Sequence, residues 1–167
     1  MKDDEYLFHQ TPKELAKDLM QFIPIQPTDI LLEPFKGEGA FFENFPASNP
    51  KLFAEIEEGI DFRDIKQPYD WVISNPPFKL DIGGSRVNKF WFLLEYYMER
   101  ANKGIAFLGN DYCLSTITPK RQAIIKERNW GITQVVVCSI KKWRGRYFFI
   151  ILEKNKPSVF QHLIKNY

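Results

Sequence analysis

The stretch Trp71-Val72-Ile73-Ser74-Asn75-Pro76-Pro77-Phe78 joins an apolar run, typical of a buried strand, to a rigid turn. Asn75 carries a side-chain amide, and the two prolines have a fixed φ and no N–H. The residue before each proline is pushed toward extended backbone, so the carbonyl groups are held outward beside the ring of Phe78. Such a corner can accept both hydrogens of a planar amino group while the ring stacks on the group that bears it. By itself, the tetrapeptide is equally compatible with an ordinary strand-ending turn.

Apolar runs and helical patterns alternate on both sides of this stretch. Thr11 is expected to cap the first helix, with Pro12 at the first helical position, and Gly104 is expected to close the second helix as a C-cap. The last two apolar runs lie close enough in sequence to pair as a hairpin. Strands are expected over residues 29–32, 51–56, 71–74, 105–108, 132–137 and 147–153, and helices over residues 13–20, 88–101 and 119–129.

This alternation predicts the α/β fold class, as a Rossmann-like, mostly parallel sheet that ends in an antiparallel β-hairpin. Ligands of such sheets bind at the carboxyl ends of the strands. Glu33, Glu55 and Asn75 each stand at such an end. We therefore expect the three side chains to converge on one edge of the sheet.

The composition is that of a folded globular protein, with 44% hydrophobic and 16% aromatic residues among 167. No apolar run approaches the roughly 20 residues that span a bilayer. The N-terminus lacks the apolar core of a signal peptide, so we expect a cytoplasmic protein with no membrane partner. Cys113 and Cys138 lack the spacing of metal ligands and are expected to be buried reduced thiols; no metal site is expected.

The net charge of +2 is unevenly distributed along the chain. Residues from Lys120 onward carry 11 Lys and Arg against 2 Asp and Glu, whereas the preceding residues carry 12 against 19. A basic C-terminal third indicates a polyanion partner such as nucleic acid, although lysines that merely solubilise the last helix and hairpin are the alternative. The clearest candidate for binding nucleic acid is Lys141-Lys142-Trp143-Arg144-Gly145-Arg146, where cations surround a ring that could stack on a base.

The segments after the first two expected strands suit a nucleoside that carries positive charge. Gly37-Glu38-Gly39 would let the backbone pass close to a ligand, and its acid favours a cation such as S-adenosylmethionine over a phosphate. A tight strand-to-helix turn is the alternative. Glu55 could accept hydrogen bonds from ribose hydroxyls. Asp61, or Asp64 in its place, could accept from the adenine amine, with Phe62 against the adenine face.

Taken in chain order, these segments resemble the S-adenosylmethionine-dependent amino-methyltransferases of the DNA adenine type. The resemblance runs from Thr11 to about Glu153. It implies that cofactor binding falls to Thr11, Pro12, Glu33, Pro34, Phe35, Gly37, Gly39, Glu55, Ile56, Asp61 and Phe62. It implies that the catalytic motif is Asn75, Pro76, Pro77 and Phe78. For substrate binding it points to Phe90, with Lys141, Lys142, Trp143, Arg144 and Arg146 added from the basic segment.

The resemblance implies methyl transfer from S-adenosylmethionine to the exocyclic amino group of adenine, in DNA rather than RNA. An RNA adenine or protein glutamine methyltransferase and an inert binding subunit with the same fold are the alternatives. Residues 1–167 are expected to form a single catalytic domain. Because no separate target-recognition domain is expected, a specificity subunit or a homodimer is a candidate partner.

Overall fold

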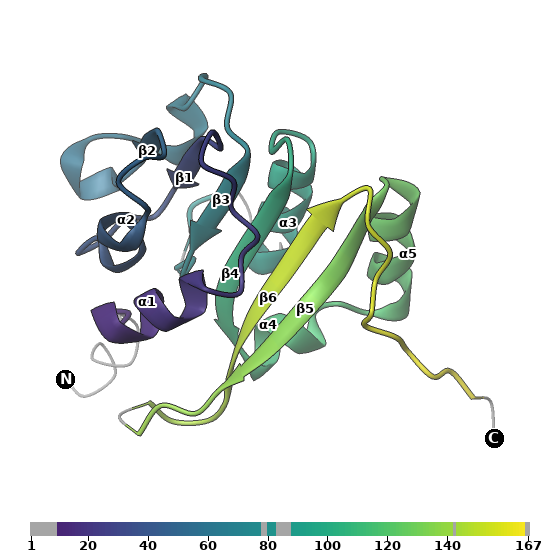
Figure 1. The fold of residues 1–167 in the computed structure, drawn as a ribbon. Coiled ribbons are helices and arrows are strands. Elements are labelled where there is room, and N and C mark those ends of the chain that lie inside the picture. The colour runs from purple at the N-terminus through teal and green to yellow at the C-terminus, as the bar shows by residue number, and fades with distance from the viewer. Residues whose placement is uncertain (1–9, 78–79, 83–87, 142, 166–167) are drawn as a thin grey trace.

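The computed structural model describes residues 10–77, 80–82, 88–141 and 143–165. Within these residues, six strands form one sheet (Figure 1). The first four strands along the chain pair in parallel, and the last strand pairs antiparallel with both of its neighbours. The α/β prediction of a mostly parallel sheet with a terminal hairpin is confirmed. The order across the sheet is β2 (Lys51–Phe53), β1 (Leu31–Glu33), β3 (Trp71–Ser74), β4 (Gly104–Asn110), β6 (Tyr147–Lys154) and β5 (Trp130–Cys138).

Helices cover both faces of the sheet (Figure 1). On one face lie α1 (Lys13–Met20) and α2 (Ala40–Asn44), whose apolar side chains pack in one core cluster. On the other face lie α3 (Lys89–Met98) and α5 (Pro119–Glu127), which share a second cluster with the short helix α4 (Asp111–Ser115). Each helix thus buries its apolar side against the sheet.

The central strand β4 shows why the sheet needs helices on both sides. Ile105 and Phe107 point into the cluster under α3 and α5, whereas Ala106 and Leu108 point into the cluster under α1 and α2. All four side chains are buried. A strand buried on both faces has a continuous apolar sequence, which is typical of parallel sheets.

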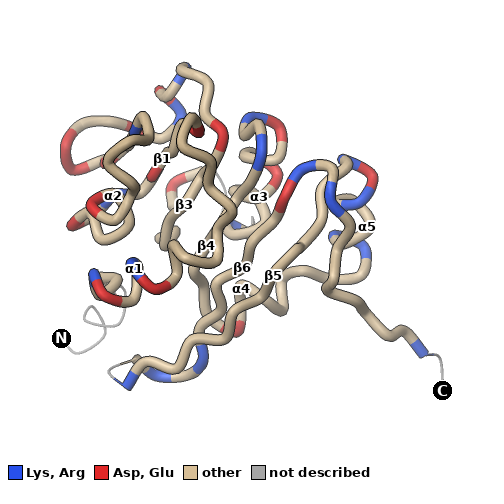
Figure 2. Tube along the Cα trace, viewed as in Figure 1, with Lys and Arg blue, Asp and Glu red and all other residues tan. Residues whose placement is uncertain are grey.

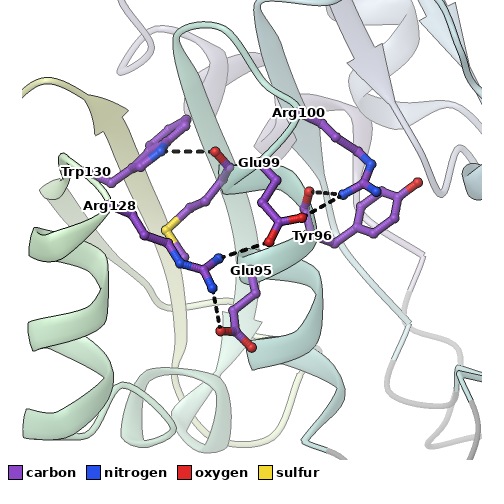
Figure 3. A network of polar contacts seen from close by, with 7 residues as sticks. Glu95, Tyr96, Glu99, Arg100, Arg128 and Trp130 are labelled. Carbon is purple, nitrogen blue, oxygen red and sulfur yellow. Dashed lines mark hydrogen bonds and ion pairs between the residues drawn. The ribbon is translucent and has the colours of Figure 1, made fainter.

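A polar network holds the C-terminal end of α3 (Figure 3). This end lies at the amino end of the strands, away from the end where ligands of such sheets bind. Arg128 pairs with Glu95 at 3.2 Å and with Glu99 at 3.5 Å, which joins the end of α5 to α3. The indole N–H of Trp130 donates to the Met98 carbonyl oxygen at 3.2 Å. The N-terminal end of α3 therefore lies near the carboxyl ends of the strands.

Both expected capping roles are wrong. Pro12 is the N-cap of α1, with extended backbone and no side-chain capping bond, so the Thr11 hydroxyl is not used there. Gly104 does not end α3, which closes at Met98 with Glu99 as its C-cap; it is the first residue of β4. A Cβ at Gly104 would lie 2.1 Å from the Trp71 ring, so the ring, not a helix end, requires the glycine.

The other differences lie in short segments. The expected strand over residues 51–56 ends at Phe53, and the chain then forms two single-turn 3₁₀ helices, η1 (Ile56–Glu58) and η2 (Phe62–Asp64). Helices α2 and α4 have five residues each, too few for a 3.6-residue period to be visible in the sequence. Among the described residues, no helix has the length and apolar character needed to cross a bilayer.

Candidate active site

The carboxyl ends of β1, β2 and β3 enclose a cavity of about 560 Å³. Glu33 is the last residue of β1, Glu55 follows β2 by two residues, and Asn75 directly follows β3. All three line the cavity, because parallel neighbouring strands end at the same edge.

Most residues singled out in the sequence for cofactor binding or catalysis line this cavity. Two do not, Pro12 and Gly39, and Phe78 lies outside the described residues. The residues brought together are Thr11, Glu33, Pro34, Phe35, Gly37, Glu55, Ile56, Asp61, Phe62, Asn75, Pro76 and Pro77.

Glu33 is a carboxyl group in an apolar environment. Its side chain is 2% exposed, and its Oε2 accepts a hydrogen bond from the backbone N–H of Phe42 at 2.6 Å. Burial raises the pKa of Glu33 to about 9, and the nearby Glu55 adds to this effect. A carboxyl group with that pKa is mostly protonated at neutral pH, and a cation beside it would favour the ionised form.

The Glu55 side chain joins the segment after β1 to the segment after β2 through hydrogen bonds. Its Oε2 accepts from the backbone N–H of Gly37 at 2.5 Å, and its Oε1 accepts from the N–H of Glu57 at 3.1 Å. Gly37 has a φ of +50°, which favours glycine. Because an ionised carboxylate has about four acceptor positions, Glu55 can still accept from a ligand hydroxyl.

Asp61 is engaged by Arg63, a residue that the sequence did not single out. Arg63 Nε donates to Oδ1 at 2.8 Å and Nη2 donates to Oδ2 at 2.6 Å. These hydrogen bonds lower the pKa of Asp61. Arg63 itself lines the cavity, while the ring of Phe62 packs on Phe35 with centroids 5.2 Å apart. The Asp-x-Arg spacing was the only signal of this pair in the sequence.

A second, smaller pocket of about 180 Å³ adjoins the same corner. Pro76 and Pro77 line both spaces, so the two prolines stand where the spaces adjoin. Phe90, expected in the substrate site, lies here on α3. Lys89 and Leu93 of the same helix also line it, as the resemblance implies for this helix, whereas Tyr112 and Cys113 were not expected.

Tyr112 is held at this pocket by Asn88. The Asn88 Nδ2 group donates to the Tyr112 hydroxyl and to Thr116 Oγ1, both at 3.0 Å. Asn88 Oδ1 also accepts from the N–H of Trp91 and so caps α3. One amide therefore joins α3 to α4 beside the pocket. The Asn88 contacts with Tyr112 and Thr116 join residues that are far apart in the sequence, so no sequence pattern predicts them.

The basic segment lies between β5 and β6, at the tip of their hairpin, and its described residues line neither space. Lys141, Arg144 and Arg146 are exposed, and Lys142 lies outside the described residues. Figure 2 shows basic residues at this tip, whereas acidic residues are frequent around α1 and α2. The tip extends from the edge of the sheet that carries the cavity, since β5 runs in the same direction as β4.

Trp143 packs against the core cluster on the face of the sheet that α1 and α2 cover. Its ring lies on that of Tyr147, with centroids 4.4 Å apart. Tyr147 pairs across the sheet with Asn110, the last residue of β4, directly before α4. The start of β6 thus lies beside the end of β4, directly before α4.

The chain is similar to solved methyltransferase structures. A modification subunit of a putative type I restriction enzyme from Vibrio vulnificus matches with a TM-score of 0.63 and 14% identity over 94% of this chain and 46% of its own. A precorrin-6y C5,15-methyltransferase from Geobacter metallireducens matches with a TM-score of 0.57 and 13% identity over 93% and 97%. A 16S rRNA methyltransferase from T. thermophilus, solved with AdoMet and guanosine, matches with a TM-score of 0.53 and 13% identity over 88% and 44%.

The fold is therefore the Rossmann-like fold of S-adenosylmethionine-dependent methyltransferases. The chain spans about half the length of the modification subunit and of the rRNA methyltransferase. No family model and no curated protein matches the sequence.

Proposed function

We propose that the chain is an S-adenosylmethionine-dependent methyltransferase that acts on the exocyclic amino group of adenine in nucleic acid, with DNA favoured over RNA. The observation that carries this proposal is that Pro76 and Pro77 line both the large cavity and the smaller pocket. A donor in the first space and an acceptor in the second would meet at the Asn75-Pro76-Pro77 corner.

The large cavity fits S-adenosylmethionine. Its volume lies within the range of about 300–1,000 Å³ that small-molecule sites occupy. Glu33 and Glu55 supply two carboxyl groups for a ligand with a cationic part and ribose hydroxyls, while Phe35, Ile56 and Phe62 supply apolar walls for an adenine ring. When bound, this cofactor supplies a methyl group already activated by its positive sulfur.

Asn75 and the Pro76 carbonyl would receive the acceptor amine. The lone pair of an aromatic amine is delocalised into its ring, which makes the nitrogen a weak nucleophile. Hydrogen bonds from its two hydrogens to the Asn75 oxygen and the Pro76 carbonyl favour a more tetrahedral nitrogen, whose lone pair is free to attack. Holding the nitrogen in place adds the rate gain that comes from proximity.

The smaller pocket suits a flat ring next to this corner. Phe90 and Leu93 give it apolar walls from α3, and Tyr112 adds an aromatic side chain from α4. Stacking on aromatic side chains contributes about 1–3 kcal/mol per base in single-strand binding, which offsets the few kcal/mol needed to take a base out of a duplex.

The basic hairpin tip supports nucleic acid as the acceptor. Phosphates would meet Lys141, Arg144 and Arg146 at the hairpin tip, which extends from the edge of the sheet that carries the cavity. The similarity to a modification subunit of a restriction enzyme supports DNA and that to an rRNA methyltransferase supports RNA. A specificity subunit or a second copy of the chain remains part of the proposal as partner.

Methyl transfer from labelled S-adenosylmethionine to separate pools of DNA, RNA and protein tests the proposal. We expect label in DNA, recovered as N6-methyladenine after digestion. Label in RNA or in protein glutamine would mean that the chain catalyses methyl transfer to a different acceptor. If the chain binds the cofactor yet labels none of the pools, it is an inert subunit and the proposal is wrong.

A further inference from the structure

Thr11 and Asn75 are 64 residues apart in the sequence, and their side chains are joined by a hydrogen bond. The Asn75 Nδ2 group donates to Thr11 Oγ1 at 3.2 Å. Both residues line the large cavity. The bond is thus located at the corner where the proposed donor and acceptor meet.

The position of Thr11 is fixed by α1 and not by the strand that carries Asn75. The N–H of Ala16 donates to the Pro12 carbonyl at 3.0 Å, so the helix starts directly after Thr11. The Lys13 carbonyl accepts from Asn44 Nδ2 of α2 at 3.0 Å, and α1 packs on the sheet through its buried side. The Thr11 hydroxyl therefore reaches Asn75 from a separately anchored element.

This bond bears on where the Asn75 amide is held relative to an acceptor. The oxygen and the NH₂ group of an amide exchange places when the group turns by 180° about its last bond. With Nδ2 turned to Thr11, Oδ1 takes the other place, where it can accept a hydrogen from an amine. Because a threonine hydroxyl can both accept and donate, Thr11 can anchor the Asn75 amide, and the hydrogens of the acceptor amine then select the orientation that offers Oδ1.

We propose that Thr11 is a positioning residue, whose hydroxyl anchors the Asn75 amide at the corner where its Oδ1 can meet the acceptor amine. This inference rests on the proposed amino-methyltransferase function. It differs from the resemblance-based role of Thr11, which is cofactor binding. Thr11 is free to make the bond because Pro12, and not Thr11, is the N-cap of α1.

Two substitutions at Thr11 separate positioning from cofactor binding. Thr11→Val keeps the shape of the side chain but removes the hydroxyl, and Thr11→Ser keeps the hydroxyl. We expect Thr11→Val to lower the turnover of methyl transfer by about 10- to 100-fold, as small misplacements of catalytic groups do. The dissociation constant for S-adenosylmethionine should stay unchanged in both variants, and Thr11→Ser should restore turnover.

The inference is overturned if Thr11→Val transfers methyl groups at the wild-type rate. It is also overturned if Thr11→Val weakens cofactor binding by the same factor as turnover, because Thr11 is then a cofactor ligand. Failure of Thr11→Ser to restore turnover would equally contradict a role for the hydroxyl.

An NMR measurement without cofactor or acceptor tests the hydrogen bond itself. The side-chain NH₂ signals of Asn75 are assigned by their loss in Asn75→Asp. We expect these signals, and their slow exchange with solvent, to be alike in the wild type and Thr11→Ser and altered in Thr11→Val. Unaltered signals in Thr11→Val overturn the inference. A wild-type protein that binds the cofactor but labels no acceptor refutes the proposed function, and the NMR result then still decides whether Thr11 holds the amide.

Discussion

Arg63 binds both carboxylate oxygens of Asp61 in a two-pronged ion pair, at 2.8 and 2.6 Å. Both residues line the large cavity. If Asp61 accepts a hydrogen bond from the adenine amine of a cofactor, as its position in the sequence suggests, that amine must share the carboxylate with three hydrogen bonds from Arg63. In that case, the ion pair lowers the affinity for the cofactor.

Arg63→Ala tests this competition. The ion pair is partly exposed, and such pairs contribute little to stability. Removing Arg63 should therefore tighten S-adenosylmethionine binding by up to about fivefold. Isothermal titration of the two proteins measures the change. Weaker binding by Arg63→Ala would show that Arg63 itself holds the ligand and that Asp61 does not receive the amine.

Glu33→Gln should change how stability depends on pH. The folded pKa of Glu33 is about 9, above its ordinary value of 4.5, so its contribution to stability is fully present below pH 4.5 and is lost as pH rises toward 9. The loss has an upper limit of about 1.4 kcal/mol for each pH unit in that window. A glutamine keeps the acceptor for the Phe42 N–H without this titration.

Thermal unfolding of both proteins from pH 5 to pH 9 measures the effect. We expect Glu33→Gln to gain stability relative to the wild type steadily as pH rises. A constant difference between the two proteins across this range would mean that Glu33 is ionised in the folded protein throughout.

Gly104→Ala should destabilise the fold through Trp71. The added Cβ would lie 2.1 Å from the Trp71 ring, which is fully buried between the sheet and its helices. Overpacking of this kind costs about 1–3 kcal/mol or more. Gly145→Ala is a control, because its φ of +81° costs about 1–2 kcal/mol but nothing lies within 4 Å of its Cβ position. A urea midpoint of Gly104→Ala equal to that of the wild type would contradict the account of Gly104.

Much of the fold was predictable because local sequence patterns determine it. The apolar run before Asn75 indicated a strand, and the order of strands and helices indicated a parallel sheet. Once parallel strands are assumed, Glu33, Glu55 and Asn75 must meet at one edge, since all three stand at strand ends. The convergence of the cavity residues followed from topology alone.

The contacts that tune the site were not predictable, because they join side chains across the fold. The hydroxyl of Thr11 looked like a helix cap, and only the sheet brings it to Asn75. Tyr112 lies on a helix too short to show a period, and its place depends on the amide of Asn88. A sequence pattern gives the element on which a residue stands but not the partner that its side chain meets.

Neutralising the hairpin tip should weaken nucleic-acid binding in a salt-dependent way. Substituting Lys141, Arg144 and Arg146 by Gln removes three exposed cations. On duplex DNA, the slope of log affinity against log salt should fall by about 0.9 for each phosphate that the variant no longer neutralises. Binding to a labelled duplex between low and moderate salt measures the slope.

A matched triple variant controls for the change in net charge. Lys17, Lys66 and Lys126 are exposed lysines away from the tip, and their substitution by Gln should leave the slope nearly unchanged. If both triple variants lower the slope equally, the hairpin tip has no particular role in binding.

The most direct test of the account is methyl transfer to adenine by the wild type and by Asn75→Ala, with cofactor affinity measured on the same two preparations. The wild type should bind S-adenosylmethionine and produce N6-methyladenine. Asn75→Ala should bind the cofactor with nearly the same affinity and produce none. Product formation by Asn75→Ala at the wild-type rate, or no cofactor binding by the wild type, would contradict the account.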